Sequence, residues 1–215
     1  MRIVLASLVF GICASAAAAQ DSMLERLESL DAGRAWQAVG RLDINGSGFC
    51  TGALIAPNLV LTAAHCLFDP RNGRSVDPKK IEFEAGLDGR RSKASRMVAA
   101  AYIHQGYQHR HKGKAQIGYD IAIVKLKNPI DSAQIRPFST DASPELGDRL
   151  RVISYTQEQA SRPILQQPCE VLARQGDTMV MNCEVEFGSS GAPVFAIQGG
   201  ARPRLVSVIA AKAEM

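Results

Sequence analysis

The chain has 215 residues, and its 46% hydrophobic and 21% charged content is that of a globular protein, not of a disordered chain, a collagen-like repeat or a membrane bundle. Its 25 basic and 21 acidic residues are interspersed, so the net charge of +4 gives no concentrated basic patch of the kind that nucleic-acid binding usually needs. Aromatic residues make up 6%, so we expect a core of Val, Ile, Leu and Ala.

The first 19 residues are typical of a secretory signal peptide. A positive start at Met1–Arg2 precedes an apolar run from Ile3 to Cys13, and small residues follow up to Ala19. This run is shorter than the roughly 20 residues that a transmembrane helix needs. We therefore expect cleavage after Ala19, export, and no membrane association of the mature chain.

Short elements follow in chain order. Helical spacing of Met and Leu from Ser22 to Asp31 predicts a helix, within an N-terminal helical or pro-segment over 20–34. Beyond it, short runs rich in Val, Ile and Ala, bounded by Gly, Pro, Asn or Asp, predict an all-β sandwich or barrel. The predicted strands are 35–42, 49–55, 59–62, 81–85, 96–104, 121–126, 149–155, 164–172, 178–183, 193–197 and 204–210.

The stretch from Asn128 to Gly147 is rich in Pro, Asp and Ser, which is typical of a connection. We expect it to join two small β units. The predicted boundaries are 35–130 for the first unit, 131–146 for the linker and 147–215 for the second unit.

Four of the five cysteines remain once the signal peptide is removed: Cys50, Cys66, Cys169 and Cys183. An even number in an oxidising compartment indicates two disulfides, for which three pairings exist. Local spacing favours Cys50–Cys66 and Cys169–Cys183, each closing a loop of about 15 residues. Because no C-x-x-C pair is present, zinc binding by these cysteines is disfavoured.

Three short motifs carry a base, an acid and a hydroxyl group. They are LTAAHC with His65, YDIAIVKL with Asp120, and FGSSGAP with Ser190. A serine hydroxyl is a poor nucleophile until a neighbouring base takes its proton. An imidazole can take that proton, and a carboxylate behind it fixes its tautomer.

Together, and in the order His, Asp, Ser, these motifs resemble the trypsin/chymotrypsin-like serine peptidase family. The resemblance runs from about Trp36 to Ala210. It implies two six-stranded antiparallel β-barrels of chymotrypsin type, with the active site in the cleft between them. It also implies three catalytic roles, with Ser190 as nucleophile, His65 as base and then acid, and Asp120 as the group that orients His65.

The same resemblance implies an oxyanion hole formed by the backbone N–H groups of Gly188 and Ser190. Animal enzymes of the family carry Asp just before the nucleophile, where it pairs with a newly cut N-terminus. Here that residue is Ser189, so this pair cannot form, and the turn looks more like that of the bacterial glutamyl-endopeptidase branch.

The residues that set specificity are less clearly indicated. Glu184 falls where trypsin-like enzymes carry the acidic floor of the specificity pocket, which would favour a basic P1 side chain. The favoured interpretation is that Glu184 and Glu186 face solvent. Val185 stands where the glutamyl branch has Thr, and no His follows His111, so glutamyl specificity is not indicated.

The sequence thus predicts a secreted or periplasmic bacterial serine endopeptidase that acts on proteins or peptides through an acyl-enzyme on Ser190. A non-catalytic homologue that binds peptides or proteins is the alternative, and activity on small acyl esters would use the same groups. We expect a monomer without cofactor, metal or nucleic-acid partner. A metal site at His109-x-His111 is disfavoured against a solvated loop.

Overall fold

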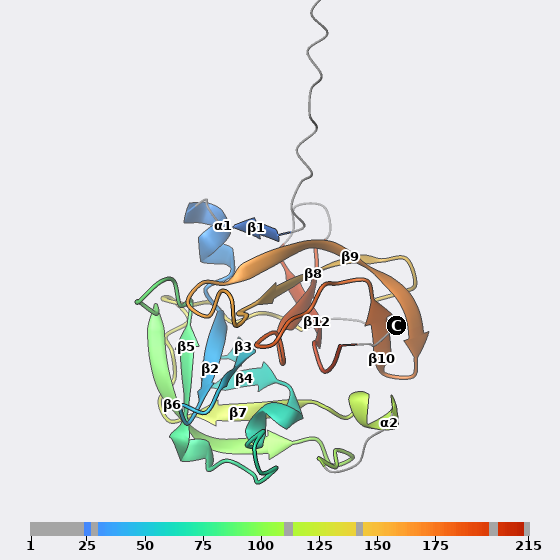
Figure 1. The fold of residues 1–215 in the computed structure, drawn as a ribbon. Coiled ribbons are helices and arrows are strands. Elements are labelled where there is room, and N and C mark those ends of the chain that lie inside the picture. The colour runs from blue at the N-terminus through green and yellow to red at the C-terminus, as the bar shows by residue number, and fades with distance from the viewer. Residues whose placement is uncertain (1–23, 27–29, 110–113, 141–143, 198–201, 213–215) are drawn as a thin grey trace, which may run out of the picture.

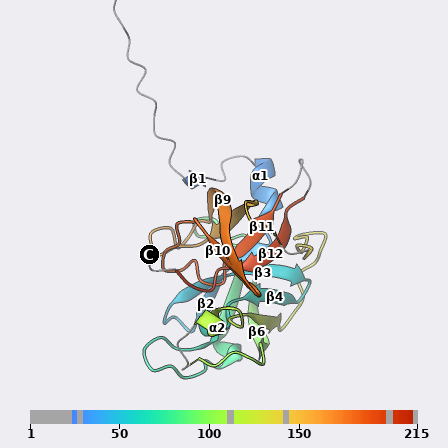
Figure 2. The ribbon, with the colours of Figure 1, turned by 90° about the vertical axis from the view of Figure 1, so that its right-hand side faces the viewer.

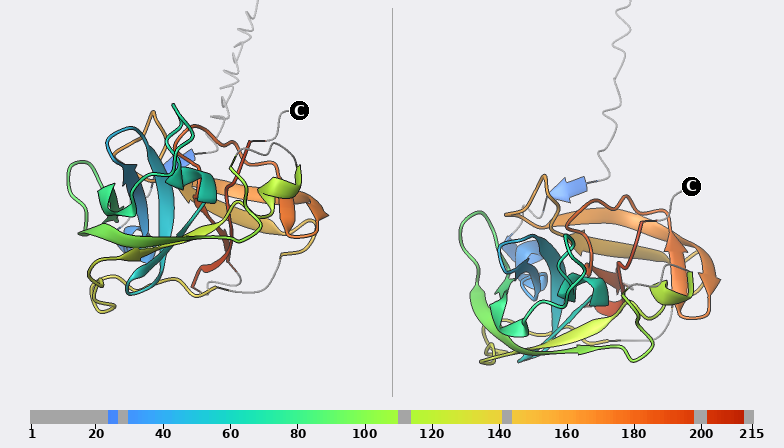
Figure 3. Two further views of the ribbon diagram at one scale, coloured as in Figure 1. Left: turned by 90° about the horizontal axis from the view of Figure 1, so that it is seen from below. Right: turned by 60° about the horizontal axis from the view of Figure 1, so that its bottom comes forward.

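The structure is a computed structural model that describes residues 24–26, 30–109, 114–140, 144–197 and 202–212. These residues form two β units that lie side by side, with two short helices and two 3₁₀ turns (Figures 1 and 3). No helix in this described part is long and apolar enough to cross a membrane. The predicted signal peptide at 1–19 lies outside the described residues.

The first unit is a closed antiparallel barrel with the strand order β2-β3-β4-β7-β6-β5. The ring closes where β2 pairs with β5, with Leu42 opposite Phe83. Its strands are β2 (Val39–Ile44), β3 (Phe49–Ala56), β4 (Leu59–Thr62), β5 (Ile81–Ala85), β6 (Ala94–Ile103) and β7 (Ala122–Leu126). The 3₁₀ turns η1 (Ala64–Leu67) and η2 (Pro78–Lys80) and the helix α2 (Lys114–Ile117) lie between them.

The second unit is one sheet with the order β1-β9-β8-β11-β12, and β10 also pairs with β9. Over the described residues this sheet curls without closing (Figure 2). Its strands are β1 (Leu24–Arg26), β8 (Arg149–Ser154), β9 (Ile164–Gln175), β10 (Thr178–Met181), β11 (Pro193–Ala196) and β12 (Arg204–Val208). The predicted chymotrypsin-type fold of two β units is confirmed, with the second as a curled half-barrel.

Burial along the barrel strands follows the two-residue period of the sequence. In β5, Ile81, Phe83 and Ala85 are buried while Glu82 and Glu84 between them are half-buried. Successive side chains of a strand point to opposite faces, so this alternation fills the barrel with apolar groups and keeps the carboxylates outside. The hydrophobic pattern therefore fixes which face of each strand points inward.

An aromatic cluster joins the two units. Trp36, just before β2, packs against Phe195 of β11 with ring centroids 5.1 Å apart. Phe138, on the segment that crosses between the units, contacts both rings, at 6.2 Å from Trp36 and 4.6 Å from Phe195. All three side chains are buried, and tilted rings at these distances pack favourably.

The crossing segment packs along both units. Ile130, Ile135 and Phe138 are buried, and the Phe138 N–H donates to Leu54 O of β3 at 2.9 Å. The next residue, Ser139, accepts through its carbonyl from the Leu205 N–H of β12 at 2.9 Å. The predicted linker thus holds the two units in register, although the boundaries 131 and 146 stay predictions.

A second contact between the units lies after β8. The buried Tyr155 donates its hydroxyl to Leu87 O of the barrel at 3.0 Å, and burial raises the pKa of this phenol, which keeps it a donor. Arg41 of β2 donates to the Ala160 carbonyl at 3.2 Å while its guanidinium pairs with Glu84 at 2.8 Å. The loop that follows β8 is therefore fixed to the first barrel.

Each predicted strand has a counterpart among β2 to β12, with ends that differ by a few residues. The predicted helix over Ser22–Asp31 is wrong at Leu24–Arg26, which forms β1 against Ile164–Gln166 of β9. The helix α1 occupies Leu30–Ala35 instead. The backbone of β9 offers hydrogen-bond partners at this edge, and such tertiary pairing overrides a weak local helix propensity.

Two disulfides are present, and they are the pairs that the spacing favours. Cys50 of β3 bonds to Cys66 of η1, with 6.2 Å between their Cα atoms. Cys169 of β9 bonds to Cys183, with 5.0 Å between theirs. Each bond closes a short loop, so each restricts the unfolded chain within one β unit.

We predict that the double variant Cys50→Ala/Cys66→Ala lowers the free energy of unfolding by about 3 kcal/mol, because a loop of this length loses its covalent closure. Urea unfolding measures the loss, and amide exchange should rise in η1. The matched control is Cys169→Ala/Cys183→Ala, which should lose similar stability without faster exchange in η1. Equal exchange of η1 in both variants would contradict the prediction.

Candidate active site

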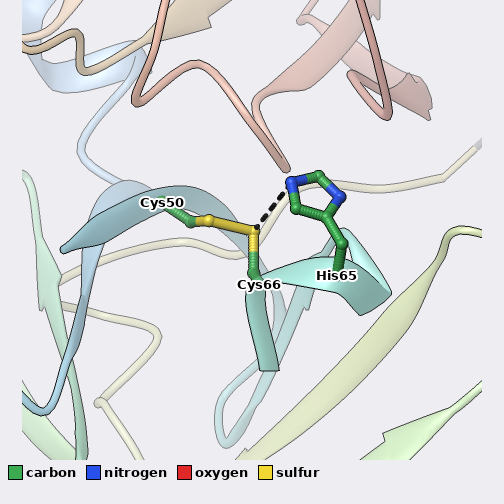
Figure 4. A group of neighbouring side chains, drawn as sticks. All are labelled: Cys50, His65 and Cys66. Carbon is green, nitrogen blue, oxygen red and sulfur yellow. Dashed lines mark hydrogen bonds between the residues drawn. A yellow bond between two sulfur atoms is a disulfide. The ribbon is translucent and has the colours of Figure 1, made fainter. Parts of the chain in front are cut away.

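His65 lies in the 3₁₀ turn η1, directly after the buried strand β4. The Phe68 N–H donates to the His65 carbonyl at 3.1 Å, and the neighbouring Cys66 is tied to Cys50 of β3 (Figure 4). Ala64 and Cys66 are buried, whereas the His65 side chain is 30% exposed. The backbone of this turn is therefore fixed while its imidazole stays accessible.

Asp120 lies between α2 and β7 and is the acid that the structure places against His65. One carboxylate oxygen accepts from the His65 backbone N–H at 2.8 Å, and the other lies 2.7 Å from the ring Nδ1. The Asp120 side chain is only 10% exposed. A carboxylate at Nδ1 holds the proton there, so Nε2 is left as the basic nitrogen.

Ser190 lies in the turn before β11, in the second unit. The next residue, Gly191, has φ +75°, and a Cβ on it would lie 2.1 Å from Thr62 Oγ1 and 2.9 Å from the Ala63 nitrogen. Only glycine allows this approach and this backbone conformation. Because Ala63 is two residues before His65, the approach brings Ser190 to the histidine turn.

The Ser190 hydroxyl has no hydrogen bond to His65 within the described part of the chain, where the ring contacts are Asp120 and the Cys66 sulfur. In unliganded enzymes the bond between nucleophile and base is often long and tightens when substrate binds. The structure thus brings the three predicted residues to one place, with the Asp–His half of the arrangement already bonded.

Two backbone N–H groups of the turn, at Gly188 and Ser190, have no acceptor among the described residues. Both peptide planes are held from their carbonyl ends: Phe187 O accepts from the Gln157 N–H at 2.9 Å, and Ser189 O accepts from the Ala192 N–H at 2.9 Å. In a trans peptide the N–H points opposite to the C=O. The two donors are therefore fixed and free to bind an anion, as the predicted oxyanion hole requires.

Ser189 is buried, at 1% exposure, and its hydroxyl donates to Ser154 Oγ at 3.1 Å. Ser154 ends β8 and is buried equally. The position before Ser190 is thus held by a neutral pair. Sequence reasoning missed Ser154, and its one signal was a hydroxyl residue at the end of an apolar strand.

The predicted specificity residues lie just before the turn. Glu184 and Glu186 are exposed, while Val185 is half-buried and packs against the core of the second unit. The Glu184 carbonyl accepts from the buried Gln166 side chain. Phe187, which follows, is 81% exposed. An assignment of Glu184 or Val185 to a substrate pocket remains a prediction.

Two side chains before Asp120, those of Tyr107 and His109, make specific contacts. His109 stacks on Phe68 with ring centroids 4.0 Å apart, and the Tyr107 hydroxyl lies 3.2 Å from His109 Nδ1. Burial and the negative charge of Asp120 raise the pKa of Tyr107 to about 12. Tyr107 therefore stays neutral beside the carboxylate. His111 of the disfavoured metal pair lies outside the described residues.

One group of side chains has the composition of a metal site. Ligand atoms of Cys50, His65 and Cys66 lie within 4.8 Å of one another, with His65 Nε2 3.9 Å from Cys66 Sγ (Figure 4). Both sulfur atoms belong to the disulfide, and metals bind thiolates. In this oxidised form the group consists of the His65 imidazole and the disulfide beside it, with no thiolate to bind a metal.

We call residues 187–191 the nucleophile turn, after the predicted nucleophile Ser190. We predict that Gly191→Ala displaces this turn, because the added Cβ would overlap Thr62 Oγ1 in a left-handed conformation. Reaction with a fluorophosphonate probe should slow by more than tenfold. Gly176→Ala is the matched control: φ is +57° there, no atom lies within 4 Å of the added Cβ, and the cost should be roughly 1–2 kcal/mol of stability with normal labelling. Equal labelling of both variants would contradict the role of Gly191.

We also predict that Ser189→Asp destabilises the fold by several kcal/mol at neutral pH, because a carboxylate would be buried against a neutral hydroxyl. Burial raises the pKa of that carboxyl in the folded state, so the folded chain binds more protons than the unfolded one. The loss should therefore grow as pH rises through about 4 and beyond. Urea unfolding at several pH values, with Ser189→Ala as control, tests this; a loss that does not depend on pH would contradict it.

Comparison with known proteins agrees with this geometry. The family model Trypsin matches residues 28–209. Serine protease 23 of Mus musculus is 24% identical over 163 residues, covering 68% of this chain and 42% of that protein, and the Homo sapiens protein matches equally. The chain thus spans less than half the length of these curated relatives.

Solved structures share the fold at lower identity. A Glu endopeptidase in complex with MPD has a TM-score of 0.70 at 18% identity, covering 83% of this chain and 80% of that one. A scabies mite inactivated protease paralogue has a TM-score of 0.65 at 18% identity, covering 85% and 84%. Because the family model spans most of the chain and the architecture agrees, the chain belongs to the trypsin/chymotrypsin-like serine peptidase family, with similarity to glutamyl endopeptidase.

Proposed function

We propose that this chain is a serine endopeptidase that cleaves peptide bonds through an acyl-enzyme on Ser190. The observation that carries the proposal is the double contact of Asp120 with His65, at 2.8 Å to the backbone and 2.7 Å to Nδ1. The bond from Asp120 to the His65 backbone is enough to hold the turn. The second bond, from the carboxylate to the ring of an accessible histidine, does not add to that structural role. It does suit a histidine that must become positively charged during a reaction.

In the first half of the reaction, Ser190 Oγ attacks the carbonyl carbon of the substrate and His65 Nε2 takes the hydroxyl proton. Asp120 stabilises the imidazolium that forms. The negative oxygen of the tetrahedral intermediate is bound by the N–H groups of Gly188 and Ser190. His65 then gives its proton to the leaving amine as the C–N bond breaks, which leaves the acyl group on Ser190.

In the second half, water attacks the acyl-enzyme and gives a proton to His65. The C–O bond to Ser190 breaks, the proton returns to Ser190 Oγ, and a carboxylic acid leaves. No cofactor is needed in this scheme, since proton transfer and backbone hydrogen bonds supply the catalysis. Small acyl esters would react with the same groups.

The substrates we propose are exposed peptide segments of proteins, cleaved by a monomeric enzyme in a secreted or periplasmic location. The two disulfides support an oxidising compartment. Cleavage of a peptide library measures which P1 residue is preferred. If the Glu184→Gln variant selectively loses cleavage after Lys and Arg, Glu184 belongs to the specificity pocket.

We predict that the chain reacts with a fluorophosphonate at Ser190 and that Ser190→Ala abolishes both labelling and peptide turnover. Asp120→Asn should lower turnover by about 10⁴-fold, because the amide holds the wrong tautomer of His65. Near-ultraviolet circular dichroism and urea unfolding serve as controls for the fold of both variants.

The outcome separates this function from the alternative of a non-catalytic binding homologue. Labelling of the wild type with loss in Ser190→Ala supports the peptidase. A correctly oxidised and folded chain that neither labels nor cleaves any peptide of the library would overturn it. Wild-type turnover by Ser190→Ala would assign the reaction to another residue.

A further inference from the structure

Thr51, the third residue of β3, uses every polar group it has. It is fully buried, at 0% exposure. Its hydroxyl donates to Gly188 O at 3.0 Å and accepts from the Tyr155 N–H at 3.0 Å. Its backbone N–H donates to Ser190 O at 2.9 Å, and its carbonyl accepts from Thr62 Oγ1 at 2.9 Å. A single barrel residue therefore binds three residues of the second unit.

Two of these bonds hold the nucleophile turn. The Gly188 carbonyl belongs to the Gly188–Ser189 peptide, which lies between the two peptides that carry the proposed oxyanion donors. Those outer peptides are held by Gln157 and Ala192. The middle peptide is held at both ends, because the Ser189 N–H donates to Glu186 O at 3.0 Å and the Thr51 hydroxyl donates to the Gly188 carbonyl at 3.0 Å. The three planes together determine where the Gly188 and Ser190 N–H groups point.

The turn has little room to compensate for the loss of this bond. Gly188 has φ +98°, and its surroundings are close enough that a Cβ would lie 2.6 Å from the Phe49 ring and 2.8 Å from Tyr155 O. Without the Thr51 hydroxyl, the carbonyl of half-buried Gly188 and the buried Tyr155 N–H would lose their shared partner. Buried groups of this kind move to find another partner, and such movement would rotate the turn.

We infer that Thr51 is a positioning residue that keeps the nucleophile turn in the conformation that receives an oxyanion. The inference rests on the proposed function of Ser190 and deepens it, because Thr51 touches no substrate and acts through the turn. The hydroxyl carries this role, since the backbone bond from Thr51 to Ser190 remains in any side-chain variant. Arg41, which faces Thr51 across the β2–β3 pair, donates instead to the Ala160 carbonyl in the loop between β8 and β9.

The test compares two substitutions of Thr51 that distinguish the effect of its hydroxyl group from the effect of its side-chain shape. Thr51→Val keeps the branched side chain and removes the hydroxyl, whereas Thr51→Ser keeps the hydroxyl. We expect Thr51→Val to slow fluorophosphonate labelling and lower kcat by at least tenfold with KM within about twofold, and Thr51→Ser to stay within threefold of the wild type. Ile81→Val, in β5, is the control for a small loss of core stability and should label normally.

A second readout does not depend on catalysis. Hydrogen exchange of peptides covering residues 186–192 should accelerate in Thr51→Val and not in Thr51→Ser. Thr51→Ala replaces Thr51→Val in both assays if the latter does not fold. Wild-type labelling and exchange in the variant without the hydroxyl would overturn the inference. If the wild type fails to label, the proposed function fails, and the exchange comparison alone decides whether Thr51 positions the turn.

Discussion

The hydrogen bond from the Thr51 N–H to the Ser190 carbonyl is the contact on which the candidate site depends, because it joins the unit that carries Ser190 to the unit that carries His65 and Asp120. His65 and Asp120 both belong to the first barrel, so the hydrogen bonds between them do not depend on the position of the second unit. Ser190 reaches them only through packing between the units. The approach of Gly191 to Thr62 and Ala63 sets that packing at the turn.

Contacts farther from the site keep the same two units aligned. The aromatic cluster of Trp36, Phe138 and Phe195 supplies apolar burial, which is strong but not directional. Two hydrogen bonds are directional: Tyr155 of the second unit donates to Leu87 O of the first, and Arg41 of the barrel donates to Ala160 O of the second. Together these contacts limit sliding of one unit over the other, so the distance from Ser190 to His65 is set by many groups acting in parallel.

The turn is held without a charge pair. Where a buried carboxylate would require a cation beside it, Ser189 presents a hydroxyl that donates to Ser154. A neutral pair of this kind costs far less to bury than an ion and contributes on the order of 1 kcal/mol. It also has no titration near neutral pH. The proposed oxyanion donors thus belong to a turn that neutral hydrogen bonds hold in place.

Much of this arrangement could be predicted from the sequence, because the residues that determine it lie close together along the chain. Strands such as β5 carry their alternation in consecutive residues, and His65, Asp120 and Ser190 stand in short motifs whose neighbours fix their turns. The two disulfides close short loops, so spacing alone favoured the pairs found. The glycines at 188 and 191 likewise indicate a tight turn around Ser190.

What the sequence did not indicate depends on partners far along the chain. Leu24–Arg26 has helical spacing, yet it pairs with β9 some 140 residues away. Thr51 stands in an apolar strand as one polar residue, and only the fold shows that its hydroxyl meets Gly188, 137 residues later. Gln157 contributes through its backbone N–H, which every residue but proline has, so no side-chain signal marks it.

Apolar residues of both units form one shared core cluster, with a smaller cluster inside the second unit, whereas the proposed reaction requires a few polar groups that meet across the contact between the units. Substitutions at that contact, such as those of Thr51, should therefore lower the rate more than they lower the stability. Substitutions inside one barrel, such as that of Ile81, should do the reverse, because they cost burial without turning the peptides that bind the oxyanion.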